Sequence, residues 1–184
     1  MRVSWALGAA VILAAGAGAA GCGKSDSSGA PAATAQGSRY WHEGDTLGNP
    51  LKTPTASEAS LAAQVLDLVN QERAGRGLPT LAWDGEAATA AHAHAEDMAA
   101  RGFFSHFTPE GWSPGDRLDM LGAAGYSGWA ENIAVGQPAA ADVMTDWMNS
   151  PGHQANILDP DLTHLGVGVV EAPGPQWVQV FLRR

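Results

Sequence analysis

Residues 150–158 read SPGHQANIL and follow a segment, residues 139–149, whose apolar side chains recur at helical spacing. Pro151 fixes its own backbone φ angle, and Gly152 permits backbone angles that are closed to other residues. The pattern therefore predicts that His153 is presented from a defined turn and not from a mobile loop. A histidine held in this way is a candidate functional residue.

Two further polar cassettes interrupt an otherwise apolar region of the chain. They read FSHF at residues 104–107 and AENIA at residues 130–134. His106 and Glu131 are the titratable residues of these cassettes, and together with His153 they form the candidate site. Because the three residues lie far apart in the sequence, only the fold can bring them together.

The region from Thr55 onwards alternates between helical and strand patterns. A capping box from Thr55 to Glu58 begins an amphipathic helix that ends at Gly75. Further helices are expected at residues 86–101, 114–121 and 139–149, and strands at residues 131–135, 165–170 and 176–182. This order predicts an α+β domain in which helices form layers on a small antiparallel sheet.

The composition indicates one acidic domain. The chain has 184 residues, of which 45% are hydrophobic and 16% charged, enough for a single domain with a substantial core. The formal net charge is −9, and from Ala56 onwards 6 basic and 16 acidic side chains give 6 − 16 = −10. A nucleic-acid interface needs a clustered basic surface, so we expect no nucleic-acid partner.

The N-terminus has the pattern of an export signal. Arg2 precedes an apolar run that ends in small residues, and AAGC at residues 19–22 resembles the lipobox of bacterial lipoproteins. This resemblance implies a signal peptide at residues 1–21 and a lipid on Cys22, which would anchor the protein to the bacterial cell membrane or outer membrane. Cys22 is the sole cysteine, so an intramolecular disulfide is excluded.

The segment after the signal is interpreted as a spacer. Residues 22–55 are rich in Gly, Ser, Ala, Thr and Pro, which is typical of a flexible tether, and the domain follows at residues 56–184. Two alternatives for the N-terminus stay open: a secretory signal cleaved after residues 17–19, which would release a secreted protein, and an uncleaved transmembrane anchor. All three interpretations place the domain outside the cytoplasm.

An ordered set of motifs points to a known family. The set includes NQERAGRGLP at residues 70–79, MAARGFFSH at residues 98–106, AENIA at residues 130–134 and WMNSPGHQANIL at residues 147–158. It resembles the bacterial branch of the CAP superfamily, also called SCP-like, which is named for cysteine-rich secretory proteins, antigen 5 and pathogenesis-related 1 proteins. The resemblance covers about residues 60–184 and implies a three-layer α-β-α sandwich.

The resemblance also implies a central cleft with a tetrad of two histidines and two acidic residues. By motif, His106 and His153 match the histidines, and Glu131 matches one acid. Ser150 stands where eukaryotic relatives carry the second acid, a glutamate, so this chain keeps three of the four polar groups. Asn132, which follows Glu131, is expected in the same cleft.

The three groups are compatible with metal chemistry. Two imidazoles and one carboxylate are the ligand types of a zinc site that leaves one position open for water, and a metal-activated water would serve a hydrolase. No His-Glu-x-x-His helix is present to arrange such ligands in advance. In the family, some members bind a divalent ion through the two histidines while the glutamates hydrogen-bond them, which implies an orienting role for Glu131.

A second group of histidines, His92 and His94, is not expected to bind metal. Side chains two residues apart on a helix point in different directions, so these two cannot share an ion. His92 and Glu96 are expected to form an exposed pair one helical turn apart.

The sequence therefore predicts an extracytoplasmic lipoprotein with one CAP-type domain on a tether. We expect binding or regulation in the bacterial cell envelope, with peptidoglycan, lipid or protein as the partner. The cofactor considered is Zn²⁺ or another divalent cation on His106 and His153. Two alternatives stay open: a metal-assisted or Ser/His hydrolase of envelope peptides or glycans that uses His106, Glu131 and His153, and a lipid-binding carrier.

Overall fold

The computed structural model describes residues 52–171 and 174–184. In these ranges the chain forms five helices and four strands. In chain order they are α1 (Ala56–Ala74), β1 (Ala82–Trp83), α2 (Gly85–Arg101), α3 (Pro114–Met120), β2 (Gly128–Val135), α4 (Ala140–Asn149), α5 (Pro151–Ile157), β3 (His164–Val170) and β4 (Gln176–Arg183). The expected signal peptide, Cys22 and nearly all of the tether lie outside the described residues.

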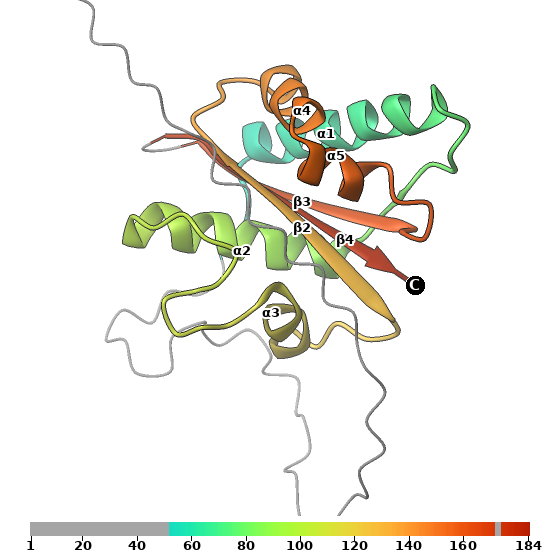
Figure 1. The fold of residues 1–184 in the computed structure, drawn as a ribbon. Helices are drawn as coiled ribbons and strands as arrows, with labels where there is room; N and C mark the ends of the chain where they lie inside the picture. The colour runs from blue at the N-terminus through green and yellow to red at the C-terminus, as the bar shows by residue number, and fades with distance from the viewer. Residues whose placement is uncertain (1–51, 172–173) are drawn as a thin grey trace, which may run out of the picture.

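The four strands form one sheet between two layers of helices. Their order is β1-β3-β4-β2, with β4 antiparallel to both neighbours. Helices α1, α4 and α5 cover one face of the sheet, and α2 and α3 lie on the other (Figure 1). The predicted α+β fold with layered helices is confirmed. The prediction missed β1, which pairs with β3 in parallel through only two residues.

Helix α2 approaches the sheet unusually closely, because β3 presents glycines to it. A Cβ atom on Gly166 would lie less than 3.0 Å from the backbone of Ala87 and Ala88, and one on Gly168 would collide with His92 in the same way. This contact buries His92, whose exposure is 5%. The expected His92–Glu96 pair is present, with 4.0 Å between His92 Nε2 and Glu96 Oε1, but it is largely buried and not exposed as expected.

His153 lies on a short helix and not on a turn, which corrects the prediction from the Pro-Gly pair. Ser150 is extended (φ −103°, ψ 114°), as expected for a residue that precedes proline, and it ends α4. Pro151 then takes the first position of α5, where its missing N–H costs nothing. The backbone of Gly152 does not use the left-handed region in this arrangement. The two helices thus change direction at Ser150, and His153 belongs to the first turn of α5.

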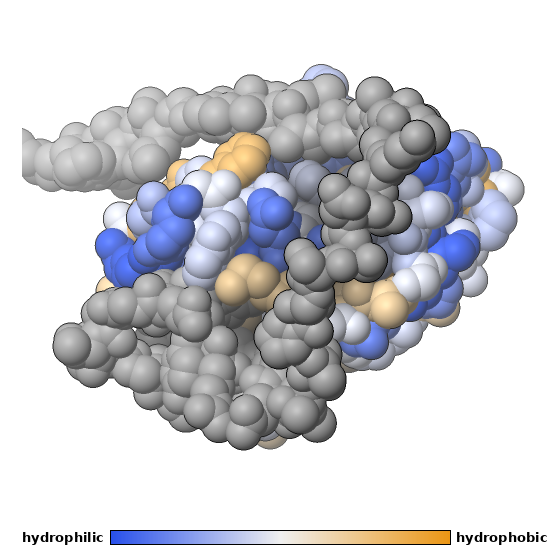
Figure 2. All heavy atoms as spheres, turned by 90° about the horizontal axis from the view of Figure 1, so that it is seen from below, coloured by the Kyte–Doolittle hydropathy of each residue, from blue (hydrophilic) through white to orange (hydrophobic). Residues whose placement is uncertain are grey.

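Apolar side chains fill both faces of the sheet. Trp147, Trp177 and Phe181 belong to the cluster under α1 and α4, whereas Met98 and Leu118 belong to the cluster under α2 and α3. In Figure 2 the part of the lower face that is not grey is mostly hydrophilic, with small separate apolar areas. Within residues 52–171 and 174–184, every helix is too short or too polar to span a membrane.

Candidate functional site

His106 and Glu131 are in direct contact. His106 lies in the loop after α2, and its Nδ1–H donates to Glu131 Oε1 over 2.9 Å. Glu131 lies on β2 and is 4% exposed. The fold therefore brings together two residues of the predicted site that come from separate cassettes.

Arg117 on α3 completes this contact and was not among the predicted site residues. Its Nη2 forms an ion pair with Glu131 Oε2, and its Nη1 donates to the backbone oxygen of His106 over 2.7 Å. Helical spacing was the available signal, because Arg117 shares the buried face of α3 with Pro114 and Leu118. One buried guanidinium thus holds both the carboxylate and the loop that carries the histidine.

These partners keep Glu131 ionised. Burial alone would raise the pKa of the Glu131 carboxyl, but the Arg117 charge and the His106 hydrogen bond outweigh burial and hold that pKa below its usual range. Both carboxylate oxygens are engaged, one by each partner. With Nδ1 of His106 bound to Glu131, Nε2 is the ring nitrogen of His106 that is left to meet a ligand.

His153 approaches from the opposite face of the sheet. Neighbouring residues of a strand point to opposite faces, so Glu131 faces α3 and Asn132 faces α5. Asn132 Nδ2 donates to the backbone oxygen of His153 over 3.2 Å. Asn156 Nδ2 donates to the backbone oxygen of Glu131 over 3.2 Å and to Asn132 Oδ1 over 2.9 Å. These amide contacts fasten α5 to β2.

The two imidazoles are close enough to act on one another electrostatically. Partial burial lowers the pKa of His153, and the charge of His106 lowers it further. β2 is the last strand of the sheet, with α3 on one side of it and α5 on the other (Figure 1). At neutral pH His153 is therefore a neutral ring that can accept a proton, a hydrogen bond or a metal ion.

The other two predicted cleft residues, Asn132 and Ser150, differ in burial and contacts. Asn132 is fully buried and also donates to Gln179 Oε1 over 2.9 Å, so it supports α5 from beneath. Ser150 is half-buried, and its Oγ has no hydrogen-bond partner in the part of the chain that the structure describes. At the position where eukaryotic relatives carry the second acid, this chain therefore has a serine hydroxyl that makes no hydrogen bond with any described residue.

His94 supports the loop from inside the domain. It is fully buried on α2, and its Nε2–H donates to the backbone oxygen of Ser105 over 2.8 Å. Sequence spacing predicts that His94 and His92 point in different directions, but it does not predict the contact of His94 with Ser105. That contact depends on the path of the loop that follows α2. His94 is therefore a positioning residue for the segment that ends in His106.

The buried His94 imidazole predicts an acid-sensitive fold. Burial lowers the pKa of His94 from 6.5 to about 4, so between these values the unfolded chain binds a proton that the folded chain does not. The free energy of unfolding should keep its full value above pH 6.5 and fall by on the order of 3 kcal/mol as the pH drops towards 4. Urea unfolding at pH 7, 5.5 and 4.5 measures this change.

The variant His94→Gln tests the assignment, because an amide can donate to Ser105 but does not titrate. Its stability should depend much less on pH across this range, whereas His164→Gln, on β3 near the end of the sheet, should leave the pH dependence close to that of the parent. Equal pH dependence in the parent and His94→Gln would show that His94 is not responsible.

The described residues do not form a three-ligand metal site. Among residues 52–171 and 174–184, no three His, Cys, Asp or Glu side chains are grouped so that they could hold a metal ion. The engaged oxygens of Glu131 explain this, because Arg117 and His106 occupy the positions that a metal would need. A divalent ion held by His106 and His153 would therefore take water as its other ligands.

Comparison with known proteins identifies the family. Residues 66–181 match the cysteine-rich secretory protein family, abbreviated CAP. The chain is a member of the CAP family. Two Bacillus subtilis proteins are 40% identical to this CAP protein over 133 residues: the uncharacterized protein YkwD, which covers 71% of this chain, and the uncharacterized membrane protein YlbC, which covers 72%. The chain spans 51% of YkwD and 36% of YlbC.

Solved structures agree with the fold of this CAP protein. An extracellular protein of Bacillus anthracis that contains an SCP domain has a TM-score of 0.66 and 34% identity, over 72% of this chain and 45% of that chain. An outer surface protein of Borrelia burgdorferi has a TM-score of 0.64 at 19% identity, over 72% of this chain and 97% of that chain. The second likeness concerns the fold alone.

Proposed function

We propose that this CAP protein is a binding module of the bacterial cell envelope, whose ligand is held between His106 and His153. The engagement of Glu131 by Arg117 and His106 carries this proposal. A carboxylate with both oxygens occupied and a lowered pKa orients the His106 ring and fixes its tautomer. The two imidazoles then remain as the groups that contact a ligand.

The hydrolase alternative has less support from the same contacts. A general acid must be protonated at the working pH, and the lowered pKa of Glu131 opposes this. A Ser/His mechanism needs a nucleophile within hydrogen-bond reach of a histidine base. In the described ranges no serine, threonine or cysteine side chain bonds to His106 or His153, and the Ser105 hydroxyl instead accepts from the backbone N–H of Phe107.

A divalent cation is the simplest ligand with which to test the cleft. When bound, such an ion would supply a positive centre that attracts an anionic or carbonyl group. We expect the protein to take up one Zn²⁺ per chain at pH 7 in isothermal titration calorimetry. Removing both imidazoles, as His106→Ala with His153→Ala, should weaken uptake by about 100-fold or more.

The matched control is His164→Ala, which removes an imidazole from the start of β3 and leaves both cleft histidines in place. This variant should bind zinc like the parent. Unchanged zinc uptake in the double variant would show that His106 and His153 do not bind the zinc ion. Uptake lost equally in His164→Ala would show that zinc binds the surface non-specifically.

We further propose that a lipid on Cys22 keeps the module at the membrane. The lipobox-like residues support this, and Cys22 itself lies outside the described residues. The membrane-extracted protein should carry an acyl mass in intact mass spectrometry, and Cys22→Ser should lack that mass and leave the membrane fraction. Equal membrane retention of Cys22→Ser would indicate an uncleaved apolar anchor instead.

A further inference from the structure

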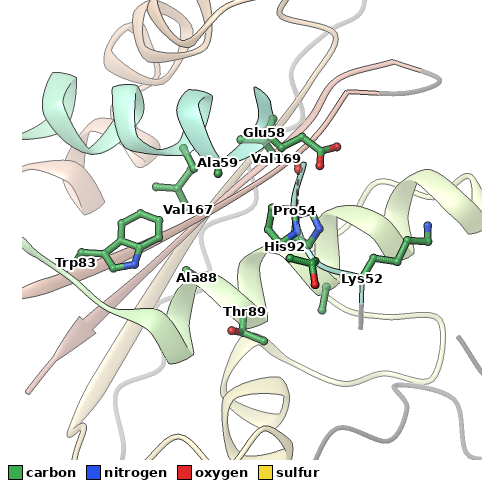
Figure 3. A pocket seen from close by; sticks show the side chains of 13 residues that line it. Lys52, Pro54, Glu58, Ala59, Trp83, Ala88, Thr89, His92, Val167 and Val169 are labelled. Atoms are coloured by element: carbon green, nitrogen blue, oxygen red, sulfur yellow. Dashed lines mark hydrogen bonds between the residues drawn. The ribbon is translucent and has the colours of Figure 1, made fainter. Parts of the chain in front are cut away.

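A groove lies at the edge of the sheet opposite the His106 cleft. It has a volume of about 380 Å³ and runs between α1 and α2 along β3 (Figure 3). Its walls are mainly small apolar side chains, contributed by Ala59, Ala62, Ala88, Ala93, Val167 and Val169. We call this hollow the β3 groove. Small walls leave room for a main chain to lie close to the sheet.

The floor of the β3 groove is an edge of the sheet that β1 covers only in part. β1 ends at Trp83, which is in register with Leu165, and Asp84 N–H donates to the backbone oxygen of Leu165 over 3.0 Å. Alternate residues of a strand direct their backbone groups to the same side, so Val167 and Val169 face this edge too. Among the described residues no strand pairs with β3 there beyond Leu165.

His92 supplies a polar group inside the groove. Its Nδ1–H donates to the backbone oxygen of Val169 over 3.0 Å, and its Nε2 lies 4.0 Å from Glu96 Oε1. Nε2 is buried and has no hydrogen-bond partner in the described part of the chain. A buried ring nitrogen without a hydrogen bond is costly, and a polar backbone group of a ligand would satisfy it. His92 therefore already serves as a partial cap on this edge.

The groove end nearest the C-terminus of β3 is acidic. Glu58 accepts from the backbone N–H of Glu171, the residue that follows β3, over 3.2 Å. Glu96 on α2 pairs with the single basic residue lining the groove, Lys52, at 3.1 Å. Two carboxylates, those of Glu58 and Glu96, against one ammonium group favour a ligand with a positive charge at this end.

We propose that the β3 groove binds an extended peptide, which pairs with β3 as an added strand. Backbone groups of the peptide take the positions beside Val167 that β1 leaves unpaired, and small apolar side chains enter between α1 and α2. A lysine or arginine of the peptide meets the carboxylate of Glu58. Strand addition of this kind draws affinity from main-chain hydrogen bonds and specificity from alternate side chains.

The test uses the full chain in detergent and the capped pentapeptide Lys-Val-Ala-Val-Lys as the probe. Hydrogen exchange followed by mass spectrometry should show that exchange in residues 164–170 slows about tenfold or more at saturating peptide. The capped pentapeptide Glu-Val-Ala-Val-Glu is the charge control and should bind at least about tenfold more weakly.

Two variants locate the effect. Ala59→Trp fills the groove from an exposed position of α1, so the folded variant should lose the slowing. Ala74→Trp, at the other end of the same helix, should keep it. Slowing that persists in Ala59→Trp, or that appears around His106 and not in β3, would overturn the proposal. The proposal would also be overturned if exchange in residues 164–170 is slow without peptide and becomes fast when residues 1–51 are deleted. The chain's own N-terminal segment would then be the occupant of the groove.

Discussion

Replacing Arg117 with methionine is expected to lower the free energy of unfolding by about 3–5 kcal/mol. The guanidinium is 1% exposed and bonds to Glu131 and to the backbone oxygen of His106. Its removal leaves an ionised carboxylate buried without its main partner, and the loop of His106 loses its clamp. Urea unfolding at pH 7 measures the change.

Two further variants separate the buried pair from a general effect of losing an arginine. Arg76→Met breaks the surface pair with Glu72, in which the arginine side chain is 44% exposed, and should change stability by less than about 0.5 kcal/mol. Arg117→Met combined with Glu131→Leu removes both charges and should recover part of the loss. If Arg117→Met costs no more than Arg76→Met, the buried pair does not carry the stability assigned to it.

Replacing Gly166 with alanine is expected to destabilise the domain by about 3 kcal/mol. The added Cβ would lie inside the backbone of Ala87 and Ala88, and backbone cannot move aside as a flexible side chain can. Helix α2 would have to lift from β3, which opens the apolar cluster shared by α2 and the sheet. Thermal and urea unfolding should both show the loss.

Gly85→Ala is the matched control for this substitution. Gly85 begins α2, and a Cβ there would meet nothing within 4 Å. Alanine is the better helix former, so this variant should equal or slightly exceed the parent in stability. A Gly166→Ala protein as stable as Gly85→Ala would mean that α2 and β3 are not packed as closely as described.

Local signals predicted the helices well and the strands less completely. The predicted capping box of Thr55 and Glu58 is present, and Asp84 and Ser113 cap the expected second and third helices, because such caps act within three or four residues. β1 escaped prediction because its two residues owe their conformation to β3, some eighty positions away in the chain. The proline at 151 correctly marked the end of α4, but sequence spacing did not show that a second helix begins there.

The sequence predicted the two histidines and the glutamate of the candidate site. It did not predict the residues that hold them in place. His106, Glu131 and His153 stand out as polar residues in apolar surroundings. Arg117 and His94 act through backbone oxygens and a buried ion pair, and these contacts depend on where a loop passes in three dimensions. No pattern along the chain records that path.

The alternation of Glu131 and Asn132 on β2 also gives the site a part in specifying the sheet. Against β4, Glu131 is in register with Val180 and Asn132 with Gln179. A slip of β2 by one residue would turn the carboxylate away from Arg117 and the amide away from α5. Both would then be buried without partners, at a cost that an apolar strand would not incur. Glu131 and Asn132, which position the site residues, thus also disfavour shifted registers of β2 against β4.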